Sequence, residues 1–218
     1  MDVIVEGKKY VVHTEHLTTV SAYFSNAFDG LFAEAKDHSI TLAPVKASTF
    51  DVFIEWIYSR QLVRSSGAPG FKQSRPGGKP RREERKDDAA HIADLIAMRS
   101  ELLSTYIFAD IYDVPQLRRD TLEAFQSLCS AREHTQGAAS LIERAYKDLP
   151  RTSPMIRFLV DIFAFAWDAS GLDEQSKYPQ EFLTVVLQKV LSSPNRTPPK
   201  NPLRHRCDYH EHKKNMDK

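Results

Sequence analysis

A change of hydrophobic period near residue 15 restricts the fold more than any other feature of the sequence. Residues 2–13, DVIVEGKKYVVH, contain two β-branched and aromatic runs on either side of Gly7 and Lys8, which predicts two short strands joined by a turn. From Glu15 onward, apolar residues recur at the three- and four-residue spacing of helices. A small sheet followed mainly by helices is typical of an α+β fold.

The rest of the chain predicts one more strand and a series of helices. SITLAPV (39–45) is a short strand stopped by Pro44, and Ser48 is expected to cap the helix that follows. Pro115 ends one helical pattern and suits the first position of the next. Apolar stripes predict three later helices, over about residues 141–149, 156–167 and 182–190.

Residues 64–88 differ in kind from their surroundings. They hold half of the eight glycines, three prolines and almost no apolar side chains. Such a run cannot bury enough surface to offset the entropy of ordering it. We therefore predict a first domain over residues 1–128 with a disordered insertion at about 63–91. A helical extension over 129–193 and a polar tail over 194–218 are expected to follow.

Composition and charge narrow the function classes. The formal net charge of the 218 residues is +1, so no global field favours nucleic acid or anionic lipid. The most apolar later segment, residues 158–167, is interrupted by Asp161 and is shorter than the roughly 20 residues of a membrane span. The N-terminus shows no secretory signal. We expect a protein of the cytoplasm or nucleus that does not enter membranes.

The two cysteines, Cys129 and Cys207, lie far apart and form no disulfide framework, which fits a reducing compartment. Cys129 ends a predicted amphipathic helix and is expected to be a small buried side chain rather than a nucleophile. The sequence contains no nucleophile elbow, phosphate-binding loop, dinucleotide fingerprint or zinc-protease motif. It therefore predicts a protein that is not an enzyme and needs no cofactor.

Residues 204–212, RHRCDYHEH, are the best metal candidate in the sequence. They contain His205, Cys207, His210 and His212, all of them ligand types that Zn²⁺ accepts. A closed zinc site usually joins two separated segments, and four ligands from one nine-residue stretch would need a tight wrap without a glycine. We expect a polar segment that folds back on the helices, with zinc binding as the alternative.

The order of these elements resembles that of BTB/POZ domains, and particular residues carry the resemblance. In this family a strand pair ends in a histidine, a leucine follows four positions later, and a small residue then precedes an aromatic–Phe step and a second Phe. The matching residues are His13, Leu17, Ser21, Tyr23, Phe24 and Phe28. SITLAPVKASTFDVFIEWIYSRQL resembles the third strand and the next helix of the family, and YIFADIYDVPQLRRDTLEAF its closing helical hairpin. The remaining helices are similar to those of BTB proteins common in filamentous fungi.

The resemblance implies a small three-stranded sheet capped by a cluster of helices, and a non-enzymatic module that binds other proteins as adaptor or scaffold. It also favours a structural role for His13, Glu15 and His16. His13 is expected to lie under the first helix and to hydrogen-bond backbone. A strand end separates it from His16, and two metal ligands at this spacing would need one continuous helix.

Two interfaces are implied by the resemblance. Transcription factors of the family often pair an aspartate on the first strand with a basic residue after the histidine; Asp2 matches the first position, but Thr14 occupies the second. Together with a sequence that begins at the first strand, this predicts at most a weak homodimer. Adaptors of cullin ubiquitin ligases carry an apolar-x-Glu step before the third strand, and Phe32 and Glu34 match it. Phe32 would fill an apolar pocket, and Glu34 would fix the orientation.

A function of another class remains as the alternative. The basic runs at residues 75–86 and 196–214 would suit a nucleic-acid- or chromatin-associated regulator, whose binding would fall steeply with salt. The near-zero net charge makes this the weaker hypothesis.

Overall fold

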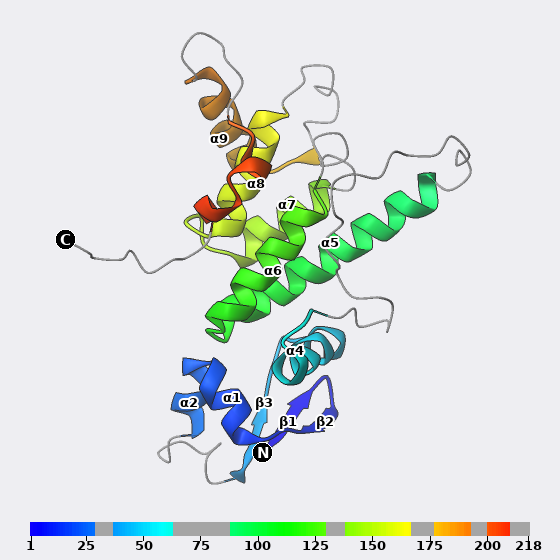
Figure 1. Cartoon of the computed structure of the whole chain (residues 1–218), viewed down its shortest axis with the longest axis vertical. Coiled ribbons are helices and arrows are strands. Elements are labelled where there is room, and N and C mark those ends of the chain that lie inside the picture. Colours follow the sequence, from blue (N-terminus) through cyan, green and yellow to red (C-terminus); the bar gives the residue numbers. More distant parts are fainter. Residues whose placement is uncertain (29–36, 63–87, 130–137, 167–176, 193–199, 210–218) are drawn as a thin grey trace, which may run out of the picture. The chain divides into compact units, whose positions relative to one another are not determined.

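The computed structural model describes residues 1–28, 37–62, 88–129, 138–166, 177–192 and 200–209 (Figure 1). The chain divides into two compact units. The N-terminal unit consists of Met1–Gly78 and Ser100–Ala124, and the C-terminal unit of Lys79–Arg99 and Phe125–Lys218. The predicted domain limits differ from this division and stay predictions.

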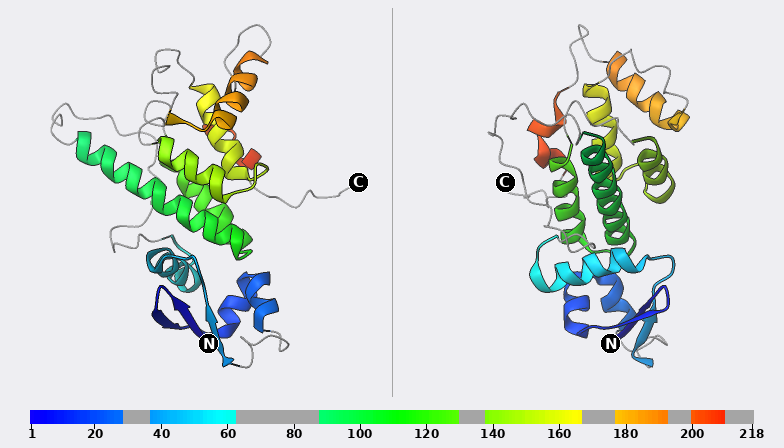
Figure 2. Two further views of the ribbon diagram at one scale, coloured as in Figure 1. Left: turned by 180° about the vertical axis from the view of Figure 1, so that it is seen from behind. Right: turned by 90° about the vertical axis from the view of Figure 1, so that its right-hand side faces the viewer.

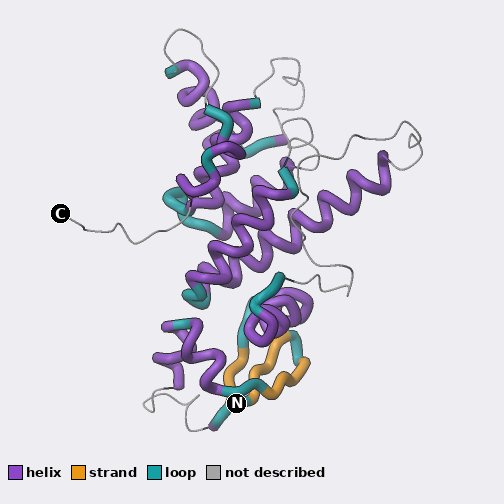
Figure 3. Tube along the Cα trace, viewed as in Figure 1, coloured by secondary structure: helices purple, strands orange, loops and turns teal. Residues whose placement is uncertain are grey.

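The strands of the described residues all lie in the N-terminal unit, where they form one three-stranded sheet (Figure 3). Strands β1 (Asp2–Val5) and β2 (Lys8–Val11) are antiparallel, and β3 (Ser39–Thr41) pairs with β1 in parallel, in the order β2-β1-β3. The turn between β1 and β2 is Glu6–Gly7, with φ of 48° and 77°, as a primed hairpin turn requires. The predicted strand pair is confirmed, but Lys8 belongs to β2 and not to the turn.

The helices of this unit begin with α1 (Thr14–Val20), α2 (Ala22–Phe28) and α4 (Ala47–Ser59), and α4 lies beside the sheet in both views of Figure 2. The prediction that Ser48 caps α4 is wrong, because Ser48 lies within the first turn of the helix. The cap comes from the β1–β2 turn, because the Glu6 carboxylate accepts the amide of Ala47 at 2.8 Å. This bond satisfies a free N–H at the positive end of the helix dipole.

Helices α5 (Asp88–Ile111) and α6 (Pro115–Ser127) each contribute residues to both units. Pro115 begins α6, as predicted. Residues 63–87 of the predicted insertion lie outside the described residues. Helix α5 begins at Asp88, which falls within the range of about 63–91 predicted for the insertion.

One apolar core joins the N-terminal residues to the second half of α5 and the start of α6. Its buried members include Val3, Val5, Leu17, Phe24, Phe50, Phe53, Trp56, Phe108, Tyr112 and Leu117. Three hydrogen bonds support it. Ser21 Oγ, between α1 and α2, donates to the carbonyl of Tyr112 at 2.6 Å and accepts the amide of Phe24 at 3.1 Å. The indole of Trp56 donates to Asp120 at 2.9 Å. Residues of the first 62 positions and residues 100–124 therefore share one core.

The C-terminal unit is built on α8 (Pro154–Phe165), whose buried residues include Phe158, Leu159, Ile162 and Phe163. Helix α8 contacts α7 (Ala138–Asp148), α9 (Gln180–Leu191) and two 3-10 helices, η3 (Pro202–Arg204) and η4 (Arg206–Tyr209). Pro202 and Tyr209 are buried, so residues 202–209 of the predicted polar tail are packed on α8. Among the described helices, none has the length and apolar character needed to cross a bilayer.

Candidate interaction surfaces

An exposed patch of two histidines and a tyrosine lies where β2 leads into α1. His13 Nδ1 is 3.0 Å from the hydroxyl of Tyr58 at the end of α4, and the rings of His13, His16 and Tyr58 meet edge to face. We name these three residues the His–Tyr patch. Tyr58 is 50% exposed, and both histidines are exposed. Amphipathic rings on a surface suit contact with another protein, because they offer apolar area together with hydrogen-bonding groups.

The expected position of His13 is wrong. It does not lie under α1, because the strand alternation turns Val12 inward and leaves Val11 and His13 outside. Its hydrogen bond is to a side chain rather than to backbone. No group of three or more His, Cys, Asp or Glu side chains that could hold a metal occurs in the described part of the chain.

Asp2 meets a cation from its neighbouring strand. Its carboxylate lies 2.7 Å from the ammonium of Lys9 on β2, with both side chains at the surface. Thr14 is the half-buried first residue of α1, and its carbonyl accepts the hydroxyl of Thr18. The structure therefore pairs Asp2 within the hairpin, where an exposed ion pair contributes at most about 1 kcal/mol. Lys9 is diagonal to Asp2 across the β1–β2 pair. A prediction of the strand register could therefore have indicated this ion pair.

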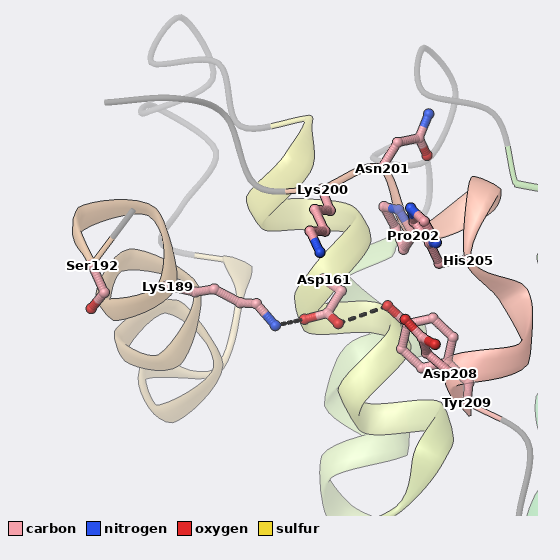
Figure 4. Close-up of a pocket in the computed structure, with 9 residues that line it drawn as sticks. All are labelled: Asp161, Lys189, Ser192, Lys200, Asn201, Pro202, His205, Asp208 and Tyr209. Atoms are coloured by element: carbon pink, nitrogen blue, oxygen red, sulfur yellow. Dashed lines mark hydrogen bonds and ion pairs between the residues drawn. The ribbon is translucent and has the colours of Figure 1, made fainter. Parts of the chain in front are cut away.

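The C-terminal unit has a polar hollow of about 340 Å³ (Figure 4). Its centre is Asp161 of α8, whose carboxylate accepts the hydroxyl of Tyr209 at 2.7 Å and forms an ion pair with Lys189 of α9. Burial, followed by the bond to Asp161, raises the pKa of Tyr209, so its hydroxyl stays a donor. The rest of the lining is Ser192, Lys200, Asn201, Pro202, His205 and Asp208.

The N-terminal strands and helices match a known family. Residues 1–69 match the family model of the BTB/POZ domain. The chain carries a BTB/POZ domain. This confirms the resemblance and the α+β fold predicted for it, and it makes the N-terminal unit a module for binding other proteins. No curated protein matches the chain.

The cullin candidates and part of the zinc candidate cannot be placed. Phe32 and Glu34 lie outside the described residues, in the connection between α2 and β3 of the BTB/POZ domain. His210 and His212 also lie outside them. His205 and Cys207 are both exposed, and His205 lines the polar hollow. Zinc binding stays the alternative that the sequence analysis gave, and the weak homodimer stays a prediction.

Cys129 directly follows the last turn of α6. The residue is half-buried, and burial of its thiol raises the pKa to about 11. The positive charges of Arg99 and Arg206 lower the pKa, but by less than burial raises it. A raised pKa keeps the sulfur in its thiol form at neutral pH, which makes it a poor nucleophile. The interpretation of Cys129 as an inert side chain is supported.

The two cysteines should differ strongly in reactivity. Burial raises the pKa of the Cys129 thiol to about 11, so very little of it is thiolate at pH 8. We expect an aromatic disulfide reagent to label the exposed Cys207 quickly and Cys129 at least about tenfold more slowly, because the Cys129 thiol is enclosed and protonated. Cys207→Ser should remove the fast phase and Cys129→Ser the slow one. Equal rates in the folded protein would contradict the assigned burial.

Proposed function

We propose that this protein is a non-enzymatic adaptor or scaffold of the cytoplasm or nucleus, of the kind found in filamentous fungi. The BTB/POZ match over residues 1–69 carries this proposal. These residues share an apolar core with Phe108 and Tyr112 of α5 and Leu117 of α6, which supports a folded interaction module. The exposed His–Tyr patch gives the domain a surface suited to a protein partner.

A cullin is the partner that the sequence favours. Phe32 and Glu34 lie between α2 and β3, where adaptors of ubiquitin ligases carry an apolar residue and a glutamate. An apolar side chain in a partner pocket supplies most of the affinity of such a contact, and a charge-assisted hydrogen bond fixes its orientation. The C-terminal unit would then hold the protein that the ligase modifies.

The double substitution Phe32→Ala with Glu34→Ala tests this. We expect co-precipitation of a cullin with the full chain to fall by about tenfold or more, because an anchor residue and its charged neighbour are both lost. The thermal midpoint should stay within about 2 °C of the unmodified protein, since both residues are expected at the surface. Glu55→Ala, which changes an exposed residue of α4 outside the His–Tyr patch, is the matched control. If no cullin co-purifies with the unmodified chain, the cullin hypothesis is wrong.

A further inference from the structure

A second hollow of the C-terminal unit shares the Lys189–Asp161 ion pair with the first. It has a volume of about 450 Å³, within the range of pockets that hold a ligand or a peptide side chain. Asp161 and Lys189 line both hollows. The other lining residues come from α7, α8, α9 and the α7–α8 connection, namely Tyr146, Arg151, Thr152, Ile156, Arg157, Val160, Glu181 and Val185.

The second hollow has an apolar floor. Ile156 and Val160 of α8 are 3% and 5% exposed, so they are held firmly in place by the core beneath them. Val185 of α9 is 39% exposed, although α9 turns Phe182 and Val186 into the core. An aliphatic or aromatic side chain placed against Val185 would remove that surface from water and gain the corresponding hydrophobic free energy.

The charges around this floor are compensated except for one. Arg151 binds Glu181 through two parallel contacts, at 2.7 and 2.8 Å, and stacks on the ring of Tyr146. Lys189 is paired with Asp161. The exposed guanidinium of Arg157 donates to the carbonyl of Asp208 and lies 5.4 Å from the ring of Tyr209. It has no carboxylate within ion-pair distance among the described residues.

An uncompensated guanidinium beside an apolar floor selects one kind of ligand chemistry. Arg157 keeps donors available for a carboxylate, which planar guanidinium groups bind with well-defined geometry. The paired charges of Arg151 and Lys189 on either side disfavour a ligand with several negative charges, because each would meet the carboxylates of Glu181 and Asp161. The geometry points to a single negative charge adjacent to an apolar group.

We propose that the C-terminal unit binds a short peptide segment of a partner protein in which an aliphatic or aromatic residue neighbours an acidic one. The apolar side chain packs on Ile156, Val160 and Val185, and the carboxylate binds Arg157. This site is separate from the BTB/POZ domain and does not depend on whether that domain binds a cullin.

The test is selection from a random 12-residue peptide library displayed on phage, with the full chain as bait. We expect enriched peptides to carry Asp or Glu within two positions of Leu, Ile or Phe. A synthetic, fluorescently labelled copy of an enriched peptide is then titrated by anisotropy. Arg157→Glu should weaken its binding by about tenfold or more, since a charge-assisted bond becomes a repulsion. Arg157→Lys, which keeps the charge, should weaken it much less.

Matched variants separate binding from folding. Val185→Glu should reduce affinity, whereas Leu191→Glu on the same helix, outside the hollow and 81% exposed, should not. A peptide with lysine in place of its acidic residue should bind the Arg157→Glu variant more tightly than it binds the unmodified chain. Phe32→Ala with Glu34→Ala should leave peptide binding unchanged, so failure of the cullin hypothesis is distinguishable.

Three results would overturn the proposal. One is a selection without an acidic–apolar signature. Another is an enriched peptide that binds Arg157→Glu as tightly as the unmodified chain. The third is tight binding of an oligonucleotide that the Arg157→Glu substitution abolishes, together with selected peptides whose binding does not depend on Arg157.

Discussion

Replacing Phe53 by alanine should lower the free energy of unfolding by about 3–5 kcal/mol. The side chain is 0% exposed at the centre of the BTB/POZ core. Its ring centroid lies 4.7 Å from that of Phe108 and 5.6 Å from that of Phe50. Alanine would leave a cavity between α4 and α5, and these neighbouring aromatic rings can close it only in part.

Urea titration followed by far-UV circular dichroism measures this effect, as a lower transition midpoint at nearly unchanged slope. Glu55→Ala is the control on the same helix, because Glu55 is exposed and its loss should change stability by less than about 0.5 kcal/mol. An unchanged midpoint for Phe53→Ala would show that the buried face of α4 is assigned wrongly.

Phe182→Ala should have an effect of similar size, about 3–5 kcal/mol, in the C-terminal unit. Phe182 on α9 is 0% exposed, and its ring meets those of Phe163 at 5.1 Å, Tyr146 at 5.6 Å and Tyr178 at 5.9 Å. Its removal takes away the contact that holds α9 on α8, and with it one wall of both hollows.

The same titration tests Phe182→Ala, with Leu191→Ala as its control on the same helix. Leu191 is 81% exposed, so its truncation should cost nearly nothing. The peptide selected for the C-terminal unit should bind Phe182→Ala more weakly, whereas it should bind Phe53→Ala normally wherever that variant remains folded. A stable Phe182→Ala protein with the midpoint of the unmodified chain would contradict the packing of α9 on α8.

The sequence predicts the elements of the fold well wherever neighbours along the chain decide the structure. The strand pair near the N-terminus and the break at Pro115 both follow from local spacing and proline geometry. The strand pair depends on residues two positions apart, and the break at Pro115 depends on the backbone restriction of one residue. The family match over residues 1–69 agrees with these local patterns.

The candidate sites are harder to predict, because their members are far apart in the sequence. Asp161 meets Lys189 and Tyr209, which follow it by 28 and 48 residues. Glu6 caps a helix that begins 41 residues later. No pattern in the sequence couples these positions, since a hydrogen bond between distant side chains depends on the packing angle and offset of the helices that carry them.

The amino-acid sequence alone is enough to predict most strands and helices and the family of the first 69 residues, but not the 3-10 helices of residues 202–209. The spacing of apolar residues makes this possible, because a helix buries one face every 3.6 residues and a strand buries one face every two residues, whatever the fold. Only the tertiary structure decided that His13 faces solvent, and that Arg157 remains without a carboxylate partner among the described residues. The exposure and pairing of a polar side chain are set by whichever distant elements pack against it, and those elements are chosen by the folded core as a whole.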